Sequence, residues 1–156
     1  MDLTKVDIFC DGACSGNPGQ GGWAFVIRTE KAEKRASNWV PNTTNNRMEI
    51  RAVLEALRTL DFTAALKAIA PNDVEVTVHT DSQYVINIAS GGWRIRKNGD
   101  LWNELFTYIK KWSPKFIHTQ EEDSQDIQAC DACAKSEARS GASPWQVWNV
   151  YDNMPD

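Results

Sequence analysis

Four single acidic residues stand where a carboxylate could do chemistry rather than only meet solvent. They lie at the end of the first predicted strand, in the first turn of a long helix, after the fourth strand and inside the last helix. These residues are Asp11, Glu49, Asp81 and Asp131. Carboxylate oxygens are preferred ligands of hard divalent ions such as Mg²⁺. Three or four that converge could hold two ions about 3.5–4 Å apart for a hydrolytic reaction, whereas without metal they would repel one another.

Asp11 is expected at the end of a strand. Val6, Ile8 and Cys10 take every second position, the period of a β-strand, and the pattern stops at Asp11. A segment with five glycines follows before a second apolar run begins at Trp23. Glycine lets the backbone approach a ligand closely or adopt positive φ. The segment suits a metal or phosphate site, and the alternative is a solvated Asp-Gly turn in a decorated hairpin.

Glu49 lies on the apolar side of a helix predicted from about residue 46 to 60. It shares one face with Ala52, Ala56 and Leu60, and a carboxylate on a buried stripe needs a partner. One explanation is a capping box, because Glu49 follows Asn46 by three residues. The other explanation is a metal ion.

Asp81 follows a predicted strand, residues 74–79, and precedes a helical segment, residues 84–89. A strand–helix–strand order suggests a parallel crossover, whose ligand site is expected at the carboxyl end of the strand. As an ordinary helix N-cap, Asp81 would need no further explanation. Asp131 stands in a helix predicted over residues 127–140 that ends at Gly141.

The elements that must position these acids follow the order βββ, α, β, α, α, β, α. The fold class is therefore α/β, with a mixed five-stranded sheet (three antiparallel strands, then parallel ones) flanked by helices. The remaining strands are expected at residues 23–27, 35–40 (ended by Pro41) and 116–118, and further helices at 62–69 and about 98–112.

Length and composition indicate one globular domain. The chain has 156 residues, of which 24% are charged, enough to bury a core and unlike a disordered segment. We expect a domain over residues 1–141 and an irregular tail, 142–156, whose Trp145, Val147 and Trp148 pack on the body. No secretory signal or membrane-spanning run is apparent, so we expect the protein in the cytoplasm. We also expect a monomer.

The net charge of −4 argues against a protein coated in basic surface for nucleic acid. Basic residues are nevertheless clustered, as at Arg94, Arg96 and Lys97. A local basic patch can still hold a phosphate backbone, because salt limits charge interactions to roughly 8 Å.

The cysteines allow a different interpretation. Cys130 and Cys133 could join Cys10 and Cys14 in a zinc site. Alternatively, two cysteines three residues apart on a helix both face the core.

Four segments together resemble the motifs of type 1 ribonucleases H, in that family's order. Residues 9–22, FCDGACSGNPGQGG, resemble its opening motif, and residues 43–49, TTNNRME, its first-helix motif. Residues 80–85, TDSQYV, and Cys130-Asp131 resemble the third and fourth motifs. Each motif alone is weak, but the resemblance covers essentially the whole chain.

The resemblance implies an endoribonuclease that cuts the RNA strand of RNA/DNA hybrids. By resemblance, Asp11, Glu49, Asp81 and Asp131 hold two Mg²⁺ or Mn²⁺ ions, which activate water for in-line attack and give 5′-phosphate products. The strand is chosen through its 2′-hydroxyl groups, which only RNA carries. The resemblance implies minor-groove and backbone contacts, including a DNA-strand phosphate at Thr44, from Gly12, Cys14, Asn17, Thr44, Asn45, Asn46 and Gln83.

Two departures from the family pattern concern binding and turnover. Many members carry a long basic insertion where this chain has only residues 86–99, so affinity should suffer. Many members also have a loop histidine ten residues before the last acid, where this chain has Glu121 beside Glu122. The histidines present, His79 and His118, are not expected to assist.

We expect the acidic loop to take over part of that histidine's task. A carboxylate of Glu121 or Glu122 near the ions could draw a metal from its working position and so release product. The alternative is a solvated loop whose charge only repels phosphates.

Three other classes of function compete with the hybrid-specific nuclease. A non-catalytic hybrid-binding module would be expected to lose an acid, yet all four are present. A related metal-dependent DNA nuclease or integrase-type enzyme can share the fold, but the residues implied to read the minor groove argue against it. The third is a zinc-bound interaction domain.

Overall fold

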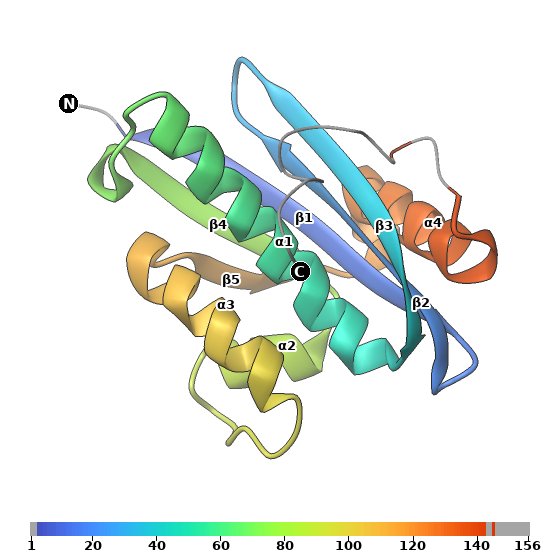
Figure 1. The fold of residues 1–156 in the computed structure, drawn as a ribbon. Coiled ribbons are helices and arrows are strands. Elements are labelled where there is room, and N and C mark those ends of the chain that lie inside the picture. Colours follow the sequence, from blue (N-terminus) through green and yellow to red (C-terminus); the bar gives the residue numbers. More distant parts are fainter. Residues whose placement is uncertain (1–2, 143–144, 146–156) are drawn as a thin grey trace.

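A computed structural model describes residues 3–142 and residue 145 of the chain. Figure 1 shows a mixed five-stranded sheet with strand order β3-β2-β1-β4-β5, as expected for this fold class. None of the helices in the described part is long and apolar enough to cross a membrane. The elements are β1 (Thr4–Ser15), β2 (Gly19–Arg28), β3 (Glu33–Thr43), α1 (Asn45–Leu66), η1 (Pro71–Asp73), β4 (Val74–Thr80), α2 (Gln83–Ala89), α3 (Gly99–Trp112), β5 (Lys115–His118), η2 (Glu121–Asp123) and α4 (Gln125–Ser140).

β1 is longer than its alternating pattern predicts, so the expectation that the strand ends at Asp11 is wrong. Asp11 lies opposite Ala24 in the antiparallel ladder with β2, which continues to Ser15 opposite Gln20. The glycine-rich segment is therefore mostly strand rather than a long loop or a solvated Asp-Gly turn. Sequence periodicity missed this extension because glycine contributes no side chain to the pattern.

The glycines of this segment let helices lie close against the sheet. A Cβ atom at Gly12 would overlap backbone atoms of Met48 and Glu49 in α1. A Cβ atom at Gly22 would overlap the carbonyl oxygen of Ala134 in α4. These two close approaches set the depth at which the helices carrying Glu49 and Asp131 sit.

Two further boundaries differ from the sequence expectation. β3 continues through Pro41, which was expected to end it. An edge strand tolerates proline because one side of its backbone needs no ladder partner. α1 is a single helix to Leu66, and its N-cap is Thr44, whose side chain accepts a hydrogen bond of 3.3 Å from the Arg47 backbone N–H. The proposed capping box of Asn46 with Glu49 is therefore wrong.

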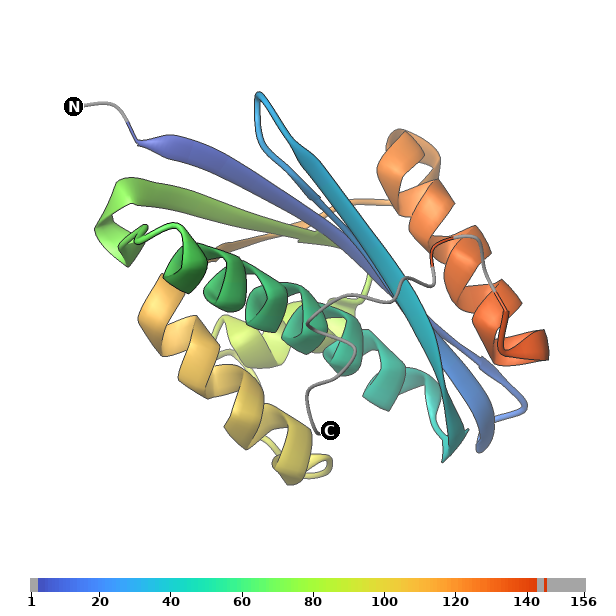
Figure 2. The ribbon, with the colours of Figure 1, turned by 45° about the horizontal axis from the view of Figure 1, so that its top comes forward.

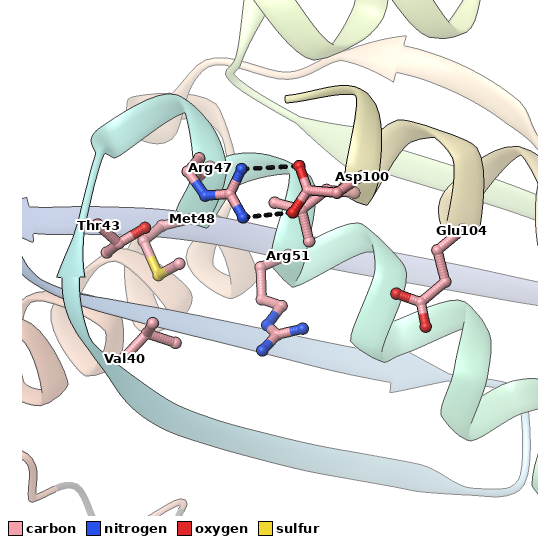
Figure 3. Close-up of a pocket in the computed structure, with 8 residues that line it drawn as sticks. Val40, Thr43, Arg47, Met48, Arg51, Asp100 and Glu104 are labelled. Atoms are coloured by element: carbon pink, nitrogen blue, oxygen red, sulfur yellow. Dashed lines mark hydrogen bonds and ion pairs between the residues drawn. The ribbon is translucent and has the colours of Figure 1, made fainter. Parts of the chain in front are cut away.

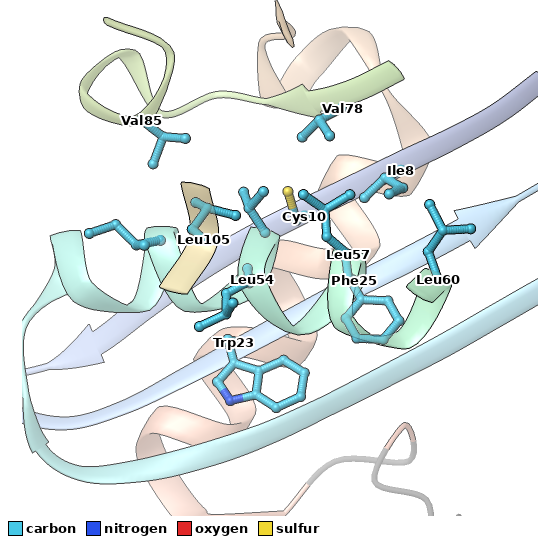
Figure 4. Packing of buried hydrophobic residues seen from close by; sticks show 14 of the residues in the cluster. Ile8, Cys10, Trp23, Phe25, Leu54, Leu57, Leu60, Val78, Val85 and Leu105 are labelled. Atoms are coloured by element: carbon cyan, nitrogen blue, oxygen red, sulfur yellow. The ribbon is translucent and has the colours of Figure 1, made fainter. Parts of the chain in front are cut away.

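The sheet separates two hydrophobic clusters. Figure 2 shows α1 and α3 on one face and α4 on the other. Alternation along β2 sends Phe25 to the larger cluster and Ala24 and Val26 to the smaller one. Figure 4 shows the larger cluster, in which Ile8 and Phe25 meet Leu57 of α1.

This division contradicts the zinc hypothesis. Cys10 is buried in the larger cluster, whereas Cys130 and Cys133 are buried in the smaller one. Burial is the main cause that raises the pKa of Cys10 and of Cys130, so these thiols stay protonated. The group of potential metal ligands within the described residues consists of carboxylates and not of cysteines.

Trp145 is buried in the smaller cluster, and the guanidinium of Arg35 lies 4.8 Å from the centre of its ring. Val147 and Trp148, which were also expected to pack on the body, lie outside the described residues. The division of the chain into a domain and a tail stays a prediction.

Candidate active site

The site forms where β4 stops alongside β1. The last pair of their parallel ladder is Phe9 with His79, and β1 continues beyond it. Asp11 therefore projects past the end of β4, and Asp81 is the first residue after that strand. The carboxylates of Asp11 and Asp81 lie close together because β1 extends beyond the end of β4.

Glu49 reaches the same place from α1. The helix crosses β1 at Gly12, whose backbone N–H lies within hydrogen-bond distance of Asp11 Oδ1, at 3.0 Å, and of Glu49 Oε1. Asp11, Glu49 and Asp81 each place a carboxylate oxygen within 4.8 Å of the others. Gly12, which the resemblance implies as a substrate contact, is thus observed to contact two of the acids through its backbone N–H.

Asp131 approaches from the opposite face of the sheet, on α4. Its Oδ2 atom forms an ion pair with Nζ of Lys135, one turn further along the helix, at 2.9 Å. Its charge raises the pKa of Asp81, and its side chain also raises that of Asp11. The structure therefore gathers three acids tightly and places the fourth beside them.

Burial and mutual repulsion govern the protonation of these acids. Burial first, and then the charge of Glu49, raises the pKa of Asp11 to about 11. Burial raises the pKa of Glu49 to about 7, although hydrogen bonds oppose the shift. Burial and Asp131 also raise the pKa of Asp81. At neutral pH Asp11 therefore keeps its proton, and the group is only partly ionised.

One oxygen of this group is buried without a partner. Asp11 Oδ2 makes no hydrogen bond within the part of the chain that the structure describes. A buried carboxylate oxygen of this kind is costly unless something satisfies it. A divalent cation fits, because it supplies charge and prefers oxygen ligands.

The interpretation of Asp81 as a helix N-cap is wrong. The cap of α2 is Ser82, whose side-chain oxygen accepts a hydrogen bond of 3.2 Å from the Val85 backbone N–H. Asp81 is left free to face the other acids. Sequence alone could not separate the two because both residues are common caps.

Exposed amide side chains flank the acids. Asn17, Asn45, Asn46 and Gln83 are all exposed. Asn17 Oδ1 accepts a hydrogen bond of 3.0 Å from the Asn45 backbone N–H, which joins the β1–β2 turn to the start of α1.

Two other substrate-site candidates are partly buried and have structural contacts. Thr44 caps α1. Cys14 lies with its Sγ 3.4 Å from the Thr43 carbonyl oxygen. The structure shows where these candidates stand, and their roles in binding stay predictions.

The start of α1 is tied to α3. Figure 3 shows the Arg47 guanidinium paired with both carboxylate oxygens of Asp100, at 3.0 and 2.7 Å. The pair lines a cavity of about 280 Å³ with Thr43 and Arg51 among its walls. The pairing lowers the pKa of Asp100 to about 2. A planar two-bond contact of this kind fixes orientation, and here it orients the helix that carries Glu49.

Sequence reasoning missed two residues at the site. His118 Nε2 lies 3.2 Å from the Asp81 backbone carbonyl oxygen, a closeness that the sequence did not indicate, and the expectation that His118 does not assist turnover stays a prediction. The position of His118 follows from the parallel pairing of β5 with β4, which places His118 opposite Thr80. The other is Lys135, whose spacing of four residues from Asp131 already indicates a pair on one helix face.

The acidic loop forms η2, close to α4. The charge of Glu121 contributes to raising the pKa of Lys135, after the larger effect of Asp131. The Glu121 carbonyl accepts a hydrogen bond of 3.1 Å from the Gln128 side chain. Glu122 is exposed. A part for either carboxylate in turnover stays a prediction.

A mixed sheet in this strand order, with carboxylates gathered beyond the end of β4, defines a ribonuclease H-like protein. The RNase H family model matches residues 4–139 of the chain. The chain therefore belongs to the ribonuclease H family.

Individual relatives agree with this assignment. The ribonuclease H of Thermoanaerobacter sp. (strain X514) is 35% identical over 153 residues, covering 88% of this chain and 92% of that protein. The ribonuclease H of Nitratidesulfovibrio vulgaris (strain DP4) is 37% identical over 159 residues, covering 92% and 96%. The structure of LC11-RNase H1 in complex with an RNA/DNA hybrid shares the fold, with a TM-score of 0.68 and 23% identity over 84% of this chain and 97% of that one.

Proposed function

We propose that this protein hydrolyses the RNA strand of RNA/DNA hybrids as a metal-dependent endoribonuclease. The observation that carries the proposal is the convergence of Asp11, Glu49 and Asp81, with the buried Oδ2 of Asp11 left without a partner. Relatives named ribonuclease H support the reaction. A structural neighbour determined with an RNA/DNA hybrid supports the substrate.

The proposed metal ligands are the four acids, with two Mg²⁺ or Mn²⁺ ions when substrate is present. When bound, such ions supply an activated water and stabilise the leaving 3′ oxygen, which gives a 5′-phosphate product. The protein's own part is to hold Asp11, Glu49, Asp81 and Asp131 together against their repulsion. Gly12 contributes through its backbone N–H, which lies between two of them.

Strand choice is proposed to rest on shape and on the 2′-hydroxyl group. Exposed amides can donate to and accept from a 2′-hydroxyl in the shallow minor groove of a hybrid, and DNA lacks that group. Asn45, Asn46 and Gln83 stand beside the acids on α1 and α2 and are exposed. Thr44 is proposed to help seat a phosphate of the DNA strand. Base-sequence preference should therefore be weak.

The test is incubation of the purified protein with end-labelled RNA/DNA hybrid, duplex DNA and duplex RNA, each with Mg²⁺, Mn²⁺ or chelator. We expect only the RNA strand of the hybrid to be cut, only with metal, and to leave 5′-phosphate ends. Cleavage of duplex DNA would favour the DNA nuclease instead. Tight hybrid binding without cleavage under every metal condition would favour a binding module.

The proposal extends to a monomer that acts in the cytoplasm. Light scattering coupled to size-exclusion chromatography gives the mass in solution, and cell fractionation gives the location.

A further inference from the structure

A groove beside the start of α1 carries chemistry that the acids do not use. It has a volume of about 680 Å³ and lies between α1, α2 and the segment that joins α2 to α3. Figure 1 shows this segment looping out below α2 and α3. Its lining includes Asn46, Tyr84, Trp93, Arg94, Arg96 and Lys97.

The groove is positively charged. Arg94, Arg96 and Lys97 line it, and none of its described lining residues is acidic. No ion pair involves these three cations within residues 3–142 and residue 145. A surface charge usually finds a partner or solvent, whereas three unpaired cations around one hollow attract an anion.

An exposed indole stands among these cations. Trp93 is 58% exposed, in contrast to Trp102, which is fully buried in the core. Burying an indole normally contributes to stability, so an exposed one beside a basic hollow offers a free aromatic face to a ligand.

The segment that carries the indole is fastened at both ends. The backbone N–H groups of Gly92 and Trp93 both donate to the Asn87 carbonyl, at 2.8 and 2.9 Å. At the other end, the Asn98 side chain donates to the Tyr84 hydroxyl at 3.1 Å. The backbone that carries the indole is thus held before any ligand arrives, which lowers the entropic cost of binding.

Cations with an aromatic face are the recognition chemistry of single-stranded nucleic acid. Inside a duplex each base face is already covered by its neighbours. A base beyond the paired region, or one that has come unpaired, has a face that can lie flat on an exposed indole. The groove therefore selects an unpaired nucleotide rather than another stretch of duplex.

Resting on the proposed function, we propose that this groove binds an unpaired nucleotide that continues one strand of the hybrid. Its base stacks on Trp93, and its phosphates lie at Arg94, Arg96 and Lys97. Asn46 lines the groove and also belongs to the row of amides beside the acids, so one substrate strand can reach both. The protein then prefers hybrids that pass into a single strand over hybrids with flush ends.

The test measures binding without metal, so that no strand is cut. Fluorescence anisotropy gives the Kd for a flush hybrid, for the same hybrid with a single-stranded DNA extension, and for one with a single-stranded RNA extension. The extension should tighten binding by wild type about 5-fold to 100-fold, the range for stacking of one base. The strand whose extension gives the gain is the source of the nucleotide.

The variants are Trp93→Ala, Trp93→Phe and the matched control Trp39→Ala, which removes a tryptophan 43% exposed on β3. We expect Trp93→Ala to abolish the gain from the extension without changing cleavage of the flush hybrid. Trp93→Phe should keep part of the gain, and Trp39→Ala all of it. Circular dichroism checks that each variant is folded.

Two results would overturn the proposal. Equal affinity of wild type for flush and extended hybrids would show that no unpaired nucleotide is bound. Equal weakening of both substrates by Trp93→Ala would mean that the indole contacts the paired region. Failure of the proposed function is a separate result, because extension-dependent binding can persist in a protein that cuts no hybrid.

Discussion

The imidazole Nε2 of His118 lies 3.2 Å from the backbone carbonyl oxygen of Asp81. His118 is the last residue of β5, and Asp81 directly follows β4. The two parallel strands thus end together, and the histidine borders the backbone of an acid at the site. A carbonyl accepts, so this hydrogen bond requires the proton on Nε2.

We expect His118→Ala to lower the single-turnover rate by up to about tenfold. A typical hydrogen bond contributes about 0.5–1.5 kcal/mol, and 1.36 kcal/mol corresponds to a factor of ten in rate. His118→Gln should retain more activity, because its amide can donate to the same carbonyl. Single-turnover cleavage of a labelled hybrid measures the effect. From the sequence alone, no effect of this substitution was expected. A wild-type rate in His118→Ala would therefore support the sequence expectation over the present one.

Asp11→Asn, Glu49→Gln and Asp81→Asn should each abolish hydrolysis while the fold survives. A metal site supplies several kcal/mol of transition-state stabilisation, so losses of roughly a thousandfold or more follow. An amide is neutral without taking up a proton, so each variant avoids the cost of burying or protonating a carboxylate, and the melting temperature of the metal-free protein should rise. Calorimetry in chelator checks this, with Glu30→Gln, an exposed acid in the β2–β3 turn, as control. Near-normal cleavage by Asp11→Asn would refute the assignment of the site.

The metal-free protein should lose stability as pH rises. Burial raises the pKa of Glu49 from 4.5 to about 7, so the folded state holds a proton that the unfolded state has released. Between these two values the free energy of unfolding falls as pH increases, by an amount on the order of 3 kcal/mol. Urea titrations in chelator from pH 4 to pH 8 measure this slope. Glu49→Gln should make the slope shallower without abolishing it, because the raised pKa of Asp11 acts in the same direction, and an identical slope in that variant would assign the whole effect to other groups.

Replacing Arg94, Arg96 and Lys97 together by alanine should weaken binding of a hybrid that carries a single-stranded extension and reduce the dependence of that binding on salt. The logarithm of affinity falls by about 0.9 per phosphate contact for each tenfold rise in salt, on a B-DNA reference. With few contacts, the wild-type slope should already be shallow. Anisotropy titrations over a range of salt give both slopes. If neither affinity nor slope changes, the phosphate contacts lie elsewhere.

The acidic loop gives a test of product release. Glu121 contributes, after Asp131, to raising the pKa of Lys135, whose ammonium pairs with Asp131. We expect Glu121→Ala/Glu122→Ala to slow multiple turnover more than single turnover. Comparing steady-state with single-turnover rates separates the two steps. Tighter hybrid binding with unchanged or faster turnover would show instead that the loop only repels phosphates.

The order of elements could be predicted because it depends on local signals. Alternation identifies strands and helical spacing identifies helices, whereas the four acids were joined into one site through the resemblance to the family motifs. The extension of β1 to Ser15 could not be predicted, because it depends on pairing with β2 and on helices that lie close above Gly12 and Gly22. Local pattern has no access to such distant contacts.

The same limit explains the errors at single residues. Glu49 matched a capping box by spacing, yet the cap is Thr44, and the carboxylate lies instead near the Gly12 backbone. His118 was judged by its distance in sequence from the last acid, whereas its position depends on which strand lies next to β5. Register across a sheet is a tertiary property, and it decides which residues join the site.

The two hydrophobic clusters have a consequence for how long the site stays assembled. α4 brings Asp131 and rests on the smaller cluster, while Glu49 stands on a helix of the larger core. Segments with fewer apolar contacts open locally while the rest of a protein stays folded. We expect α4 to open locally before the larger core does, so that Asp131 leaves while the other acids stay together. A cation held by all four acids would bind only the closed form, so cation occupancy and the hydrogen-exchange rate of α4 amides should change together.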